Sequence, residues 1–198
     1  MSDLLGLEDS MDNKRFIRFL ASVNGWHAGD EEVKLTKFLL DPTSVKSGWG
    51  RLKSETAPHW KWDEKLGVRG TLPKERDNEK LTEEERLEYK RGFTVDLYSK
   101  ELGVRTWSST SAGATKGFLK LYTELNEQLS ANENKVAVIE YIGSDAITIG
   151  KGNSRIPNFK ILGWRTDDAF ELSAEAEFDD VPLELNGSAT ETEEEIPF

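Results

Sequence analysis

Charge is distributed very unevenly along this chain of 198 residues, and this limits which part of it can fold. Residues 167–198 include 12 acidic residues and no Lys or Arg, whereas the first 166 residues carry the other 25 acidic residues and all 26 basic ones. A segment of high charge and low hydrophobicity cannot bury enough apolar surface to offset the entropy lost on folding. We therefore expect a folded unit over residues 14–166, a flexible N-terminus over 1–13, and a disordered acidic tail over 167–198.

The composition excludes several classes of site. The chain has no cysteine, which excludes disulfides, thiolate metal ligands and cysteine nucleophiles. The two histidines, His27 and His59, have no metal-binding spacing, and no hydrolase, zinc-protease or kinase motif occurs. The acidic N-terminus has too short an apolar run for a signal peptide, and no stretch approaches the roughly 18–20 apolar residues of a membrane span. We therefore expect a cytoplasmic protein that is not an enzyme and uses no metal, cofactor or membrane.

Short strand-like segments dominate the part that is expected to fold. Apolar residues alternate with polar ones within many of these segments, and glycines separate several of them. Residues 112–130 instead show apolar residues every three or four positions, with Ser111 as a capping residue, which predicts the principal helix. Residues 53–80 are irregular, and Thr82–Arg91 predicts a short helix. This order predicts a mainly β fold, an OB-fold-like Greek-key barrel over 14–166 with an insertion at 53–91.

Aromatic and basic residues alternate in several of these segments. Proteins that bind single strands combine a positive groove for the phosphates with rings on which the bases stack. Trp60 and Trp62, if extended, point the same way, and with Trp107 they are the predicted stacking rings; Trp26 and Trp164 are assigned to the core or its rim. Lys46 joins the predicted phosphate contacts. The full predicted nucleic-acid-binding set comprises Trp49, Arg51, Lys53, Trp60, Lys61, Trp62, Tyr98, Arg105, Trp107, Lys151 and Arg155.

The run Gly150-Lys151-Gly152-Asn153-Ser154-Arg155 lies between two predicted strands. Its exposed backbone N–H groups and two basic side chains favour phosphate binding. It lacks the spacing of a nucleotide-binding P-loop and does not begin a helix. A plain hairpin loop fits the same residues equally well, so both readings stay open.

The chain ends with an acidic cluster followed by Ile-Pro-Phe, formed by Glu193, Glu194, Glu195, Ile196, Pro197 and Phe198. This ending resembles that of bacterial and bacteriophage single-stranded DNA-binding proteins of the OB class. The resemblance covers about the last nine residues by motif, and the body only by the order of its elements. It implies a bacterial or phage protein that binds single-stranded DNA, with a tail that recruits replication, recombination and repair proteins. Phe198 and its carboxylate would supply an apolar anchor and a charge for the partner.

Two other functions are compatible with the sequence. The chain could be an adaptor or inhibitor that acts through its acidic tail alone, in which case deletion of residues 190–198 removes all activity. It could also be an enzyme of nucleic-acid metabolism without a recognisable motif. The sequence leaves the oligomeric state and the preference for DNA or RNA open.

Overall fold

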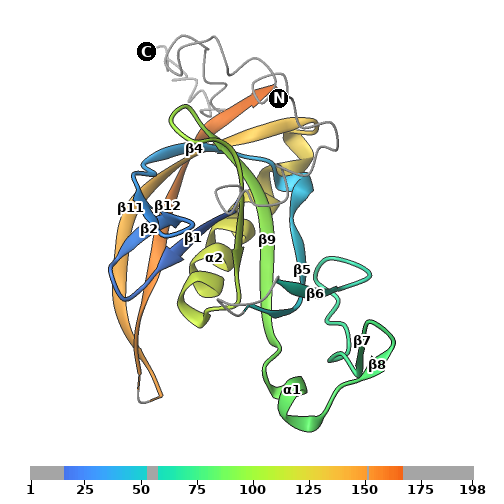
Figure 1. Ribbon diagram of the computed structural model, residues 1–198. Helices are drawn as coiled ribbons and strands as arrows, with labels where there is room; N and C mark the ends of the chain where they lie inside the picture. The colour runs from blue at the N-terminus through green and yellow to red at the C-terminus, as the bar shows by residue number, and fades with distance from the viewer. Residues whose placement is uncertain (1–15, 53–57, 151, 167–198) are drawn as a thin grey trace, which may run out of the picture.

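The computed structural model describes residues 16–52, 58–150 and 152–166. The predicted N-terminal segment, the acidic tail with its docking residues Glu193 to Phe198, and the predicted contacts Lys53 and Lys151 lie outside these ranges. Within them the fold is mainly β with one principal helix, as the sequence predicts (Figure 1). None of the helices in these ranges is long and apolar enough to cross a membrane.

Ten strands of the described part form one mixed sheet, in the order β12-β11-β4-β9-β10-β1-β2-β3. Strand β5 also pairs with β9, and β6 pairs with the far edge of β5. All pairs are antiparallel except β1 with β10, where Ile17 lies opposite Trp107. The strands are β1 (Phe16–Leu20), β2 (Gly25–Ala28), β3 (Glu31–Val33), β4 (Lys37–Leu40), β5 (Lys46–Arg51), β6 (His59–Trp62), β9 (Lys90–Ser99), β10 (Gly103–Ser109), β11 (Lys135–Ile149) and β12 (Gly152–Thr166).

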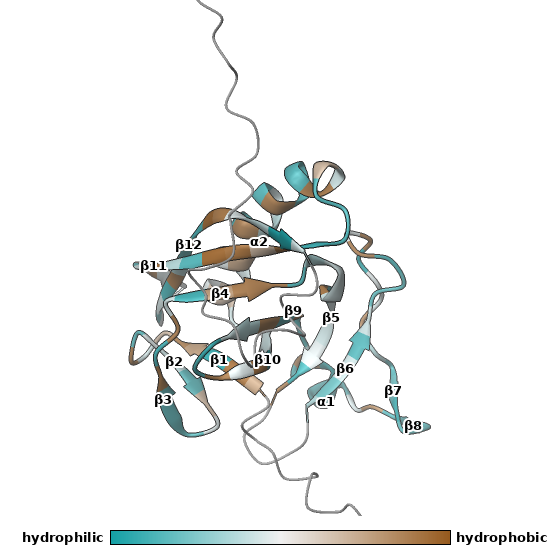
Figure 2. Ribbon diagram, turned by 90° about the horizontal axis from the view of Figure 1, so that it is seen from above, coloured by the Kyte–Doolittle hydropathy of each residue, from teal (hydrophilic) through white to brown (hydrophobic). Residues whose placement is uncertain are grey.

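The sheet curls into a barrel-like form that side chains complete. Trp26 of β2 contacts Tyr141 of β11, with ring centroids 5.7 Å apart, and Phe159 of β12 at 6.3 Å. Figure 2, seen from above, shows β12, β11, β4, β9, β10, β1 and β2 following one another around the molecule. The side of the barrel between β2 and β11–β12 is therefore joined by aromatic packing.

The interior of the barrel is filled by apolar residues from every main strand and from the helix. Trp107, Leu97 and Ile139 are fully buried there, and Trp26 and Trp164 are almost fully buried, as predicted. Burial of large apolar side chains contributes about 1.5–3 kcal/mol each, so this cluster dominates the stability of the fold.

Helix α2 (Ala112–Gln128) begins where Ser111 accepts a hydrogen bond from the backbone N–H of Ala114, and it confirms the predicted helix. The helix packs tightly on β12. A Cβ atom added at Gly113 would lie 2.2 Å from the carbonyl oxygen of Arg155, so only glycine allows this approach. At the other end Trp164 Nε1 donates to Gln128 Oε1 at 2.9 Å.

The insertion between β5 and β9 contains β6, the short strands β7 (Glu75–Arg76) and β8 (Glu79–Lys80), and helix α1 (Glu83–Leu87). Thr82 and Glu85 form the predicted capping box. The helix is shorter than the predicted Thr82–Arg91, because β9 begins at Lys90 and takes up the last predicted helical residues. Gly92 therefore lies inside a strand and does not end a helix.

Strands β11 and β12 continue beyond the barrel as a two-stranded ribbon, here taken as residues 143–157. The pairing runs to Ile149 opposite Gly152, so the loop is shorter than the predicted six residues: Gly152, Asn153, Ser154 and Arg155 belong to β12. A positive φ of 60° at Gly150 allows the sharp reversal at the tip.

Candidate nucleic-acid interface

Trp60 and Trp62 lie on one face of β6, as their spacing predicts. Strand register places Trp60 opposite Gly50 and Trp62 opposite Gly48 of β5. Paired residues of an antiparallel ladder share a face of the sheet, so both indoles lie over glycine positions. On β9, Gly92 lies opposite Gly48 and Lys90 lies opposite Gly50.

The indoles of Trp60 and Trp62 stack into a column on the face of β5 that carries Gly48 and Gly50, here called the glycine surface. Their ring centroids are 4.5 Å apart and their planes differ by 9°, so they are stacked on one another. A Cβ atom added at Gly50 would lie 2.6 Å from the indole of Trp60, and one at Gly92 would lie 3.0 Å from it. A side chain at Gly50 would displace the ring, which explains the glycine at that position. At Gly92 the carbonyl oxygen of Ser109, 2.2 Å from an added Cβ, already requires glycine.

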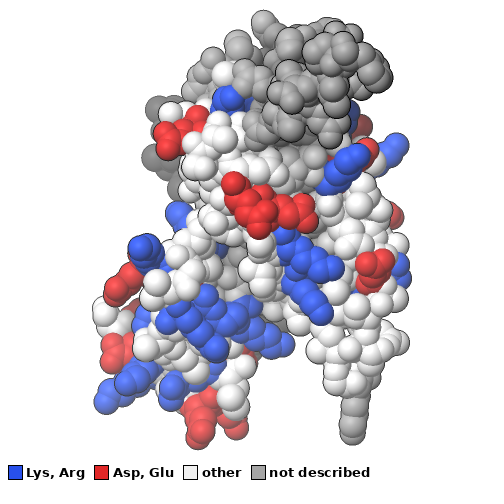
Figure 3. Space-filling model, turned by 180° about the vertical axis from the view of Figure 1, so that it is seen from behind, with Lys and Arg blue, Asp and Glu red and all other residues white. Residues whose placement is uncertain are grey.

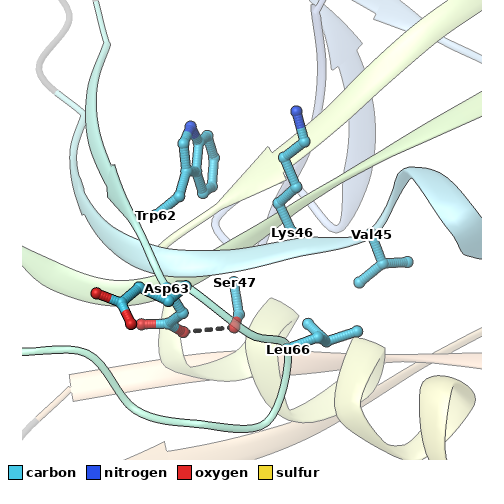
Figure 4. Close-up of a pocket in the computed structure, with 7 residues that line it drawn as sticks. Val45, Lys46, Ser47, Trp62, Asp63 and Leu66 are labelled. Atoms are coloured by element: carbon cyan, nitrogen blue, oxygen red, sulfur yellow. Dashed lines mark hydrogen bonds between the residues drawn. The ribbon is translucent and has the colours of Figure 1, made fainter.

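The outer ring of the column is exposed. Trp62 keeps 37% of its surface accessible, whereas Trp60 is half-buried between Trp62 and the glycines. A hollow of about 310 Å³ lies next to Trp62, lined also by Val45, Lys46 and Leu66. Figure 4 shows Trp62 and Lys46 standing on the same side of β5 with open space between them. An exposed indole beside a lysine is the combination that stacks a base and holds a phosphate.

A buried carboxylate fixes the chain directly after Trp62. Asp63 has a side chain that is only 1% exposed, and both of its oxygens accept from the guanidinium of Arg91, at 2.7 and 2.5 Å. It also accepts from the hydroxyl of Ser47 at 2.5 Å and from the backbone N–H of Gly70 at 2.8 Å. The bonds from Arg91, which outweigh the opposing effect of burial, hold the pKa of Asp63 well below its usual range. Ser47 and Gly70 lower it further.

Trp49 belongs to this structural network and not to the column. Its register partner on β6 is Lys61, so Trp49 lies on the face opposite Trp60 and Trp62. The guanidinium groups of Arg69 and Arg91 lie over its ring at 5.0 and 5.5 Å, and its Nε1 donates to the carbonyl oxygen of Gly70 at 2.8 Å. Trp49 therefore anchors the insertion to the barrel.

Two predicted aromatic contacts are wrong. Trp107 is completely buried and packs against Phe93, with ring centroids 4.8 Å apart, so it cannot stack on a base. Tyr98 is 6% exposed and lies in a separate apolar cluster with Leu39 and Val138. Tyr98 pairs with Val104, so it lies on the face opposite Arg105, because Arg105 pairs with Leu97.

The predicted cations are likewise dispersed. Arg51 is bound to Glu88, which neutralises it. The guanidinium of Arg155 donates to the hydroxyl and carbonyl oxygens of Ser144, at 2.7 and 3.0 Å, inside the ribbon. Arg105 is half-buried and donates to the carbonyl oxygen of Val104. Lys61 is exposed but lies on the face opposite the column. Among the predicted cations that the structure describes, Lys46 is the one beside the column.

Surface charge separates the two parts of the molecule that project from the barrel. Figure 3 shows Lys and Arg side chains gathered on the projection formed by the insertion, while the ribbon carries almost none. An open space separates the two projections in the same view. On the face shown, cations therefore gather on the projection that carries the column, together with acidic side chains at its edges.

Sequence reasoning missed the residues that hold the column in place. Asp63 and Arg91 are 28 residues apart, and no local pattern predicts an ion pair over that distance. Gly48 and Gly50 indicate a bend in the sequence, but their role under the indoles follows only from the register of β6. No group of three or more His, Cys, Asp or Glu in the described ranges could hold a metal ion.

Comparison of the chain with protein-family models, with curated proteins and with solved structures finds no match. The interpretation of this site therefore depends on its own geometry and on the sequence.

Proposed function

We propose that this protein binds single-stranded nucleic acid, DNA in the first place, without sequence selectivity and without catalysis. One base stacks on the exposed face of Trp62, the phosphates follow the basic surface of the insertion, and the protein protects the exposed strand. The acidic tail recruits replication and recombination proteins through its last six residues.

The observation that carries the proposal is the stacked pair Trp60–Trp62 on its glycine surface, with Trp62 37% exposed beside Lys46. A large aromatic ring is normally buried in a core, because its exposure forfeits about 1.5–3 kcal/mol. Here the absence of a side chain at Gly50 leaves room for the indole of Trp60, since a Cβ there would lie 2.6 Å from the ring. Base stacking accounts for such a site, since every base presents a π-face and stacking on a protein ring contributes about 1–3 kcal/mol.

Titration of the tryptophan fluorescence with oligo-dT, oligo-U and a duplex tests the proposal. We expect quenching by the single strands and little by the duplex, because paired bases cannot stack on a protein ring. The logarithm of the affinity should fall linearly with the logarithm of the salt concentration, by about 0.7 per neutralised phosphate. Unchanged fluorescence together with a flat salt dependence would contradict the proposal.

Deletion of residues 190–198 tests the role of the tail separately. Binding to oligo-dT should be retained or become tighter, because the tail is anionic and competes for the same cations. Capture of partner proteins should be lost. Loss of strand binding in the deletion variant would instead favour the adaptor that acts through the tail alone.

A further inference from the structure

We propose that single-stranded DNA runs from the Trp60–Trp62 column across the outer face of β5, β9, β10 and β1 to a second contact, which the ring of Phe16 and the guanidinium of Arg18 form. This inference rests on the proposed function and assigns the path of the DNA beyond Trp62, away from the insertion.

One row of polar residues crosses four neighbouring strands on the face that carries the column. Lys46 of β5 pairs with Thr94 of β9, which pairs with Ser108 of β10. Strand β1 pairs with β10 in parallel, and their register places Arg18 beside Ser108. The residues before and after Thr94, Ser108 and Arg18 are buried in the barrel, so these three side chains point outward. The four residues are here called the polar row; β1, β9 and β5 follow one another from left to right in Figure 1.

An exposed ring lies near each end of the polar row, and the two rings are on opposite sides of it. Trp62 lies over Gly48, two residues after Lys46 on β5. Phe16 lies two residues before Arg18 on β1, which in this register is the opposite direction along the sheet. It is 45% exposed, and exposure of a large ring forfeits the gain from its burial, as it does for Trp62. DNA that contacts both rings therefore crosses the polar row diagonally.

The guanidinium of Arg18 is accessible to a phosphate. It donates to the carbonyl oxygen of Gly29 at 3.0 Å and lies 3.6 Å from the carboxylate of Asp30. The side chain of Arg18 is 49% exposed and that of Asp30 is fully exposed, so water screens this ion pair and it contributes little. The remaining N–H groups of the guanidinium are thus available for a phosphate oxygen.

The middle of the polar row offers hydroxyl groups. Ser108 donates to the hydroxyl oxygen of Thr94 at 3.2 Å, which leaves the proton of Thr94 for a phosphate oxygen. Asp96, two residues further along β9 on the same face, is half-buried and accepts from the hydroxyl of Thr106 at 2.6 Å. A row of donors with a cation at each end suits the phosphates of a single strand.

The spacing of the two rings sets the length of DNA that reaches both. The polar row spans three strand spacings, about 14 Å, and the positions of the rings differ by four residues along the strands, about 13 Å. The diagonal between them is therefore about 20 Å. A strand stacked as in a duplex rises about 3.4 Å per nucleotide, so about six nucleotides connect the rings, and fewer do so if the DNA is extended.

The affinity of the full chain for an oligo-dT of about twelve nucleotides tests the second ring. Phe16→Leu keeps an apolar side chain but removes the π-face, so we expect binding to weaken about tenfold, measured by anisotropy of an end label. Leu119→Ala, on an exposed residue of α2, is the control and should leave the affinity unchanged. Circular dichroism checks that both variants are folded.

Two results of this titration would overturn the path in different ways. Equal affinities of Phe16→Leu and the unchanged protein would overturn the path across the sheet and leave the proposed function intact. Failure of the unchanged protein to bind oligo-dT would overturn both.

The salt dependence tests the far end of the polar row. Arg18→Gln should reduce the salt slope for the same oligo-dT by about 0.7, the value for one neutralised phosphate on a single strand. Lys100→Gln removes an exposed charge from the turn between β9 and β10, outside the polar row, and should change the slope less. An unchanged slope in Arg18→Gln, or an equal effect of Lys100→Gln, would overturn the contact with Arg18.

Discussion

The insertion and the ribbon both project from the same end of the barrel, but different interactions hold them (Figure 1). The insertion is fixed by a buried ion pair and two cation–π contacts, formed between residues 20 to 42 apart in sequence, and by the stacked pair of Trp60 and Trp62. The ribbon is held by its backbone ladder and by Arg155 bonded to Ser144, and its described residues from Ala146 to Ser154 carry no charge. The insertion, which is held by specific side-chain contacts, is thus the projection that exposes rings and cations.

Of the changes predicted here, removal of the buried carboxylate of Asp63 should have the largest effect, which is a loss of stability. Asp63→Ala leaves Arg91 without its partner, and we expect the free energy of unfolding to fall by about 3 kcal/mol. Asp145→Ala, on an exposed carboxylate of the ribbon, should change it by less than about 1 kcal/mol. Urea unfolding measures both. Similar values for the two variants would mean that the ion pair does not hold the insertion.

Binding of single-stranded nucleic acid should depend more on the insertion than on the ribbon. Trp62→Ala should weaken oligo-dT binding by about 2 kcal/mol, because it removes the exposed face of the column. Ile149→Ala, on a residue 43% exposed near the tip of the ribbon, should weaken it by less than about 0.5 kcal/mol. Isothermal titration at fixed salt measures both. Equal losses would show that the strand lies between the two projections and contacts both.

The glycine surface can be tested without touching a tryptophan. Gly50→Ala places a Cβ against Trp60, so we expect a loss of about 1.5 kcal/mol in stability and a change in the near-ultraviolet circular dichroism of the stacked indoles. Gly152→Ala in the ribbon is the control, since the nearest atom to its Cβ would lie at 3.7 Å. An unchanged spectrum in Gly50→Ala would mean that the column does not need the glycine.

Acid should act on the insertion before the ribbon. The folded state holds the pKa of Asp63 below the ordinary value of 3.8, so its contribution to stability is complete above that value and is lost as the pH falls. We expect a loss of about 1 kcal/mol between pH 5 and pH 3 that is absent in Asp63→Asn. Urea unfolding at each pH measures it. The same acid sensitivity in both proteins would assign it to other carboxylates.

Local patterns predicted the elements that depend on local interactions. The spacing of Phe118, Leu121 and Leu125, with Ser111 as cap, identified α2, and Gly103 marked the turn between β9 and β10. Alternation also placed Trp107 and Arg105 on one face of β10. It could not say that this face is the interior, because that depends on which strands lie on either side of β10. Trp107 was therefore assigned to the surface although it is completely buried.

The candidate site was predicted in part for the same reason. The spacing of Trp60 and Trp62 shows that they share a face, and the structure adds that they stack on one another. Trp49 and Arg51 also have the composition of a binding site, but Arg91 and Glu88, which engage them, lie 42 and 37 residues further along the chain. Contacts of this kind depend on the folded topology, and a single sequence carries no signal for them.

The aromatic contacts of Trp26 bear on how the chain is made. Synthesis proceeds from the N-terminus, yet Trp26 packs on Phe159, and β1 pairs with β10, which begins at Gly103. Strand β1 can pair with β2 early, but its pairing with β10 requires most of the domain to have left the ribosome. Contacts between such distant residues slow folding. During that interval Phe19 and Trp26 can pack on one another but lack Tyr141 and Phe159, so a nascent chain that stalls before residue 159 would be a substrate for chaperones.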